Sequence, residues 1–212
     1  STFAPHSLPG GRGNQYSWDT EYMSKLWQSK GWMRGDAAQQ VRKHYGGYSM
    51  SPRKGLRVIS INTDFWYYTN FFNYIHSENP DYSGMLRFLT DELFRAEKDG
   101  ERVWIIGHVI TGWDGSESIF KPTELFYHIV SRFAPHTIAA IFFGHTHEDH
   151  FQVFYRATDS STTKVKRNTM NAVATSFIAP SITTYQNLNP TFRVMKVDPD
   201  TYDVYDFDQY YT

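Results

Sequence analysis

The sequence has no cysteine, no marked excess of one charge sign and no long hydrophobic run. Without cysteine, disulfides and thiolate metal sites are excluded. With 21 Lys and Arg against 22 Asp and Glu, the formal net charge is -1, so there is no basic patch of the kind that binds nucleic acid or an anionic membrane. No apolar window approaches the roughly 18–20 residues that a membrane span needs.

The first residues lack two further features. "STFAPHSLPGGRG" has neither an initiator methionine nor the apolar segment of a signal peptide, which indicates a processed or truncated start. A length of 212 residues suffices for one sizeable core, so we expect one domain over 1–212.

Aromatic residues, by contrast, are plentiful at 17%. They could form a bulky core with an aromatic-rich surface, or they could line a pocket that stacks on or encloses a ligand, including a cationic one. Composition leaves both interpretations open.

Hydrophobic periodicity predicts alternating helices and strands over much of the chain. Helices are expected at about 17–30, from Met85 to Gly100 and from about Pro122, and buried strands in "GLRVISIN", at 103–107 and in "TIAAIFFG". This alternation predicts an α/β fold with β-α-β units. Farther on, "FQVFYR", "MNAVATSFIA", "TFRVMKVD" and "YDVYDF" read as short strands without a helical period between them, which predicts an antiparallel sheet in the last third.

Two glycine-histidine junctions, which together carry three histidines, stand at the ends of apolar strands. His145 and His147 stand in "IFFGHTHEDHFQVFY", and His108 in "WIIGHVITGWDG". In an extended segment His145 and His147 would project to one side about 6–7 Å apart. Such a pair could bind one metal ion, or each histidine could bind one of two ions about 3.5–4 Å apart, and the separation favours the second option. Because ligands collect at the carboxyl ends of strands in α/β sheets, we expect all three rings at one rim. A single histidine of this kind is more often a hydrogen-bonded scaffold residue.

Other polar residues near the rim are candidates for weaker roles. Glu148, Asp149 and His150 fall outside the alternating face, and we interpret them as supporting or solvated residues. Asn62, after "RVISIN", could orient a ligand histidine. Trp66 and Trp113 are candidate pocket residues.

These motifs resemble the calcineurin-like metallophosphoesterases, because "GH…GHTH" is similar to the last two metal-binding motifs of that family. The segments "GLRVISINTDFWYYTNFF", "LTDELFRAEKDGERVWIIGHV" and "FIAPSITTYQNLNPTFRVMKVD" resemble the acid sphingomyelinase branch, fungal sphingomyelin phosphodiesterases in particular. The resemblance implies an αββα sandwich with mixed sheets flanked by helices. It also implies two divalent metal ions, commonly zinc, with His108 and His145 on one and His147 on the other.

The resemblance further implies hydrolysis of sphingomyelin or a related phosphodiester to a ceramide-type alcohol and phosphocholine, in an extracellular, vacuolar or lysosomal location. In this setting Tyr185, in "TTYQNLNP", could contact the phosphate or the choline, or could instead pack on Phe192.

The family's earlier D-x-H, G-D and G-N-H-[DE] motifs are not found. "RGD" at 34–36 contains a G-D pair, but it follows helix-like sequence and is rejected. We therefore expect 1–212 to be the carboxyl-terminal half of a catalytic domain, with the amino-terminal half as its missing partner and the catalytic residues upstream. Alone it should be inactive. The alternative is a non-catalytic metal-binding or structural module.

Overall fold

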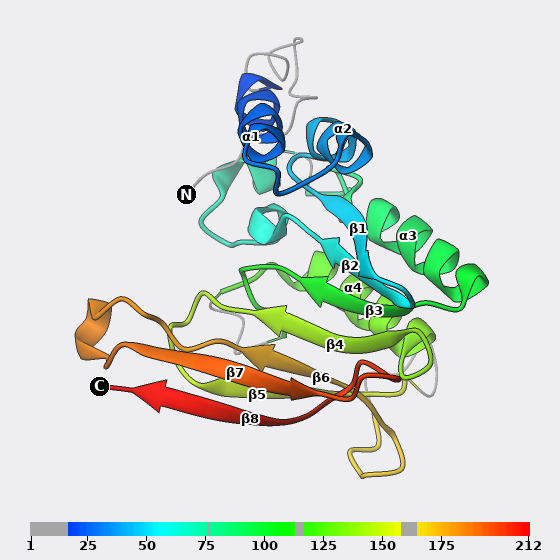
Figure 1. The fold of residues 1–212 in the computed structure, drawn as a ribbon, viewed down its shortest axis with the longest axis vertical. Coiled ribbons are helices and arrows are strands. Elements are labelled where there is room, and N and C mark those ends of the chain that lie inside the picture. Colours follow the sequence, from blue (N-terminus) through cyan, green and yellow to red (C-terminus); the bar gives the residue numbers. More distant parts are fainter. Residues whose placement is uncertain (1–16, 76, 113–116, 158–164) are drawn as a thin grey trace.

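The computed structural model describes residues 17–75, 77–112, 117–157 and 165–212 (Figure 1). Its longer helices and its strands follow one another in this order: α1 (Ser17–Ser29), α2 (Gly35–Lys43), β1 (Tyr48–Arg53), β2 (Leu56–Ser60), α3 (Met85–Asp99), β3 (Arg102–Ile106), α4 (Phe120–Phe133), β4 (Ile138–Phe143), β5 (His150–Tyr155), β6 (Ala172–Ile178), β7 (Thr191–Val197) and β8 (Val204–Tyr211). None of the helices in these ranges is both long and apolar enough to cross a bilayer.

The main sheet has six strands in the order β1-β2-β3-β4-β6-β5. β2, β3, β4 and β6 run parallel, while β1 and β5 pair antiparallel at the two edges. The parallel strands therefore end at a single edge of the sheet, where the loops that follow them meet.

Helices α3 and α4 cover one face of this sheet. Val103 and Ile105 of β3 and Leu89 and Leu93 of α3 are all fully buried in one core cluster, as the alternation of a strand and the 3.6-residue period of a helix require. Gly100 ends α3 at φ 67° with its N–H bonded to Ala96 O, because a residue without Cβ adopts the left-handed region readily.

The β7–β8 hairpin lies in front of the sheet in Figure 1, on the face opposite α4. Its turn is held by Trp104, whose Nε1 donates to Tyr202 O at 2.9 Å, and by Tyr202, whose hydroxyl donates to Lys54 O at 2.7 Å. Arg102 adds an ion pair to Asp203 at 2.6 Å. The turn of the hairpin is thus fastened to the main sheet away from the edge at which the parallel strands end.

Arg193 of β7 fastens the hairpin to the main sheet a second time. Its Nε donates to Gln209 Oε1 at 2.7 Å, its Nη1 donates to Ile178 O at 3.3 Å, and its guanidinium lies 4.6 Å from the Phe207 ring centre. It also forms an ion pair with Asp149. Burial lowers the pKa of this arginine, because enclosing the guanidinium penalises its charged form.

The predicted helices and strands are confirmed, and so is the mixed α/β sheet flanked by helices. The antiparallel pairing expected in the last third is confirmed for β5 with β6 and for β7 with β8, but these strands do not form one separate sheet. β6 enters the main sheet parallel to β4, because its apolar residues Val173 and Ile178 are buried between β4 and β5. Sequence reasoning also missed α2 and β1; the "RGD" stretch opens α2 rather than following a strand.

Arg193→Met should lower the free energy of unfolding by about 1–3 kcal/mol, because it removes the hydrogen bonds and the ion pair of a buried guanidinium. Thermal unfolding of the 212-residue chain measures this as a fall of roughly 2–4 °C per kcal/mol. Arg53→Met, at an exposed arginine of β1, is the matched control. Equal stability of the two variants would contradict the anchoring role.

Candidate metal centre

The loop after β3 places His108 at the edge of the sheet where the parallel strands end. Gly107 N donates to Phe142 O at 3.0 Å, and Gly144 N donates to His108 O at 3.0 Å. A Cβ on Gly107 would stand 2.7 Å from Thr63 Cγ2 and 2.8 Å from Phe143 Cε1, closer than atoms can approach. The position before His108 therefore requires glycine, because Thr63 and Phe143 leave no room there for a side chain.

Thr63, in the loop after β2, holds the His108 loop from the other side. It is buried, and its Oγ1 accepts hydrogen bonds from His108 N at 3.1 Å and Val109 N at 2.7 Å. Neighbouring Asn62 fixes this loop in turn, because its Oδ1 accepts from Asp64 N at 3.0 Å. The ends of β2 and β3 are thus joined by side chain to backbone bonds.

His145 and His147 both adopt the left-handed region, at φ 76° and 64°. The expected extended H-x-H pair is therefore wrong: β4 ends at Phe143, and the chain bends there. Thr146 N donates to Gly144 O at 3.0 Å, and Ser181 N donates to His147 O at 3.2 Å. Left-handed residues other than glycine are uncommon, although histidine is enriched among them, and they cluster at functional sites.

The bend brings the His145 ring against the His108 ring. His145 Nδ1 lies 3.4 Å from His108 Nε2, and the ring centres are 5.2 Å apart at 80°. Partial burial lowers the pKa of His108. The neighbouring rings of His145 and His147 lower this pKa further, whereas the charge of Asp64 raises it. Although His108 as a whole residue is exposed, these effects favour its neutral form, which is the form that binds metal.

Two residues that sequence reasoning missed complete the surroundings of His145. Glu117 Oε2 lies 2.8 Å from His145 Nε2, and the Tyr67 ring meets the His145 ring edge-on, with centres 4.8 Å apart. Glu117 belongs to the "GWDGSES" stretch after the first G-H, which has no periodicity and no spacing relative to His145. Only the tertiary structure brings the two together.

His147 lies beside Tyr185, with ring centres 6.0 Å apart at 79°. Tyr185 is 66% exposed, while Phe192, its alternative partner, stacks on Tyr210 with ring centres 5.0 Å apart. In the part of the chain that the structure describes, no three His, Cys, Asp or Glu side chains are grouped to hold a metal ion. The convergent pair is His108 with His145, and the role of His147 stays a prediction.

Glu148, Asp149 and His150 take supporting contacts next to the histidine loop. His150 Nε2 lies 3.2 Å from Glu148 Oε2, and Asp149 pairs with Arg193. These contacts tie the chain that leaves the histidine loop to itself and to the hairpin.

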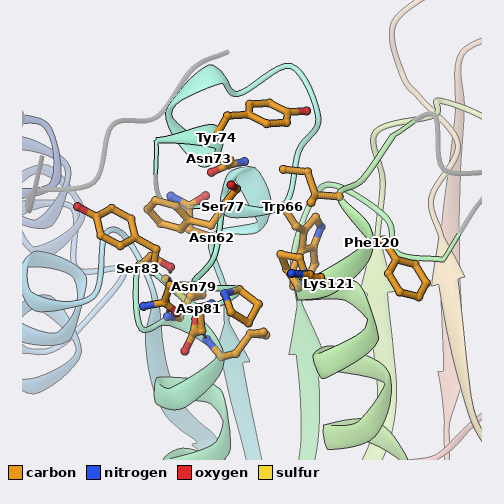
Figure 2. A pocket seen from close by; sticks show the side chains of 17 residues that line it. Asn62, Trp66, Asn73, Tyr74, Ser77, Asn79, Asp81, Ser83, Phe120 and Lys121 are labelled. Carbon is orange, nitrogen blue, oxygen red and sulfur yellow. Dashed lines mark hydrogen bonds between the residues drawn. The ribbon is translucent and has the colours of Figure 1, made fainter. Parts of the chain in front are cut away.

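A cavity of about 410 Å³ lies beside the histidine edge, over the first turns of α3 and α4 (Figure 2). Lys121 and Phe120 line it on the α4 side, and Asp81 and Ser83 on the α3 side. Trp66 lines the cavity too; its ring is buried, and its Nε1 donates to Val109 O at 3.0 Å.

The remaining predicted residues divide between this cavity and the undescribed part. Asn62 lines the cavity, and its Nδ2 donates to Tyr45 O at 2.9 Å; the structure records no histidine as its partner among the described residues, so a role in orienting one stays a prediction. Trp113 lies outside the described residues.

The sequence and the fold are similar to those of known phosphodiesterases and of PhoD, respectively. Sphingomyelin phosphodiesterase 1 of Caenorhabditis elegans is 33% identical over 213 residues, covering 100% of this chain and 35% of that protein. Sphingomyelin phosphodiesterase of Homo sapiens is 38% identical over 93% of this chain and 28% of that protein. The solved structure of PhoD matches 85% of this chain and 38% of its own, with 10% identity and a TM-score of 0.51. No model of a known protein family matches the sequence.

The fold is therefore a mixed α/β sheet flanked by helices, shared with PhoD. Within that class, the chain is homologous over most of its length to the sphingomyelin phosphodiesterases. It spans about a third of the length of these two relatives. They are animal proteins, so the fungal assignment stays a prediction.

Gly107→Ala should destabilise the chain by about 1–3 kcal/mol, because the added methyl overlaps Thr63 and Phe143 and forces the strand ends apart. Gly144→Ala is the matched control, since its Cβ would make only ordinary contacts, 3.5 Å or more from the His108 ring. Urea unfolding of both variants measures the difference. Equal loss in both would show that the first G-H glycine has no special steric role.

Proposed function

We propose that the chain forms part of a phosphodiesterase site in which His108, His145 and His147 bind two divalent metal ions. The observation that carries the proposal is the approach of His145 Nδ1 to His108 Nε2, at 3.4 Å, at the carboxyl edge of the sheet. Homology to sphingomyelin phosphodiesterases supports the reaction class.

The spacing of these two nitrogens fits a shared ion. Two imidazole ligands at about 2.0–2.1 Å from one tetrahedral ion are themselves about 3.3–3.4 Å apart, which agrees with the observed 3.4 Å. The lowered pKa of His108 keeps a lone pair available at neutral pH. Zinc is the ion that we propose, because nitrogen ligands in tetrahedral geometry suit it.

His147 lies on the Tyr185 side of the same loop, and we assign it to the second ion. Bound divalent ions neutralise charge on a phosphodiester and lower the pKa of a bound water from about 15.7 toward about 7. The three histidines act as ligands, and proton transfer to the leaving group is left to residues outside this chain.

We propose a sphingomyelin-like phosphodiester as the substrate, in keeping with the names of the relatives. The exposed Tyr185 ring next to His147 can take the choline group, since a cation over an aromatic face gains about 0.5–2 kcal/mol. An extracellular, vacuolar or lysosomal location remains part of the same proposal.

The chain supplies imidazoles but lacks the D-x-H and G-N-H-[DE] motifs. We therefore propose that 1–212 is a partial catalytic domain whose amino-terminal half provides the bridging carboxylate. A non-catalytic metal-binding or structural module is the alternative, and the experiments below separate the two.

Zinc binding to the 212-residue chain should depend on the histidine pair. Competition with a chromophoric chelator should give weak binding that His108→Ala and His145→Ala each abolish, because each removes one ligand of the shared ion. His136→Ala, at an exposed histidine of the α4–β4 turn, should leave binding unchanged. Binding that survives both ligand substitutions would contradict the metal centre.

The 212-residue chain with zinc should not hydrolyse bis-p-nitrophenyl phosphate or sphingomyelin faster than the His108→Ala, His145→Ala double variant. The physical reason is that neutral imidazoles alone do not supply the carboxylate that bridges two ions. The human relative, assayed in parallel, serves as the positive control. Turnover above the double variant would show that the described ligands suffice and that the domain is not partial.

A further inference from the structure

We infer that Glu117 is a positioning residue that fixes the His145 ring so that Nδ1, rather than Nε2, is the metal-binding nitrogen. The inference rests on the proposed function for its metal but on the contacts of Glu117 for its geometry. It names a residue that lies outside the G-H and G-H-T-H motifs.

The hydrogen bond between Glu117 and His145 determines which ring nitrogen carries hydrogen. Glu117 Oε2 lies 2.8 Å from His145 Nε2. An ionised carboxylate can only accept, so Nε2 must donate and carries the proton. In the neutral ring the bare nitrogen is then Nδ1, and Nδ1 is the atom that faces His108 Nε2 at 3.4 Å.

Backbone hydrogen bonds fix the chain at Glu117 and on its carboxyl side. Tyr68 N donates to Glu117 O at 3.2 Å, and Ile119 N donates to Trp66 O at 2.7 Å. Between them Tyr67 and Ser118 form a bridge pair. Residues 66–68 and 117–119 therefore form a short two-stranded clasp next to His145.

The clasp also reaches the other ligand. Trp66 Nε1 donates to Val109 O at 3.0 Å, directly after His108, and the Tyr67 ring packs edge-on against His145. One structural unit thus limits the movement of both imidazoles. The side chains of Glu117 and His145 are 28% and 16% exposed, so solvent screens their bond less than that of a surface pair.

A carboxylate behind a ligand histidine sets its tautomer and orientation and raises its basicity, and loss of such a partner typically weakens metal binding about 10–100-fold. An isolated surface ion pair would have no comparable effect on metal affinity. The two interpretations of Glu117 therefore differ in a measurable quantity.

The first arm of the test is nitrogen-15 NMR of histidine side chains in the metal-free 212-residue chain, recorded over a pH series. The neutral form of His145 should be the Nε2–H tautomer in the wild type and in Glu117→Gln, whose amide oxygen still accepts. Glu117→Ala should lose this preference. A wild-type His145 in the Nδ1–H tautomer, or an unchanged tautomer in Glu117→Ala, overturns the inference.

The second arm is zinc affinity, measured by chelator competition. Glu117→Ala should bind about 10–100-fold more weakly than the wild type, with Glu117→Gln in between. Glu124→Ala, which removes an equal charge from an exposed position of α4, should bind like the wild type. Equal affinities for all four proteins overturn the inference. If Glu117→Ala does not fold, Glu117→Asp, which withdraws the carboxylate by one methylene, gives the same comparison.

The two arms separate this inference from the proposed function. If the wild type binds no zinc, the metal centre fails, while the tautomer measurement still decides the role of Glu117. If the wild type binds zinc through His108 and His145 but Glu117→Ala leaves tautomer and affinity unchanged, the metal centre stands and the positioning role is wrong.

Discussion

The parallel pairing of β3 with β4 is the constraint on which the candidate site depends. It brings two glycine-histidine junctions, 37 positions apart in the sequence, to one edge of the sheet. Gly107 N donates to Phe142 O and Gly144 N donates to His108 O, so the strand ladder continues into the loops that carry the imidazoles. A shift of register by one residue would turn every following side chain to the other face and would separate the two rings.

The loops at this edge show how a rigid sheet fixes irregular backbone. His145 and His147 are left-handed, a conformation that persists only where the surroundings over-determine it. Those surroundings include polar contacts: Thr63 Oγ1 to the His108 loop, Ser181 N to His147 O, and Glu117 to the His145 ring. The Tyr67 and Tyr185 rings also contact the two histidines, so the cost of the bend is offset by contacts from several loops around the rim.

The parts of this structure that sequence predicts are those in which local pattern and global fold agree. Helices such as α3 and buried strands such as β3 carry their periodicity in a few adjacent residues, and the G-H motifs mark the edge. What fails depends on distant partners. The extended H-x-H geometry was wrong because bonds from Gly144 and Ser181 bend that loop, β6 joined the main sheet through its fit beside β4, and Glu117 has no sequence relation to His145.

Under the proposed function, charge balance limits what the histidine edge could do by itself. Neutral imidazoles contribute direction and lone pairs but no negative charge, whereas two divalent ions held close together repel each other strongly in a partly dry site. Glu117 contacts His145 through Nε2, whereas Nδ1 of the same ring faces His108. The negative charge of Glu117 therefore lies behind the His145 ring and would not lie between two ions. In the proposed function a bridging carboxylate would come from the amino-terminal half, and His108 is exposed. If the proposed function holds, the three histidines would orient the ions, and a closely spaced pair of ions would also need acidic groups beside it.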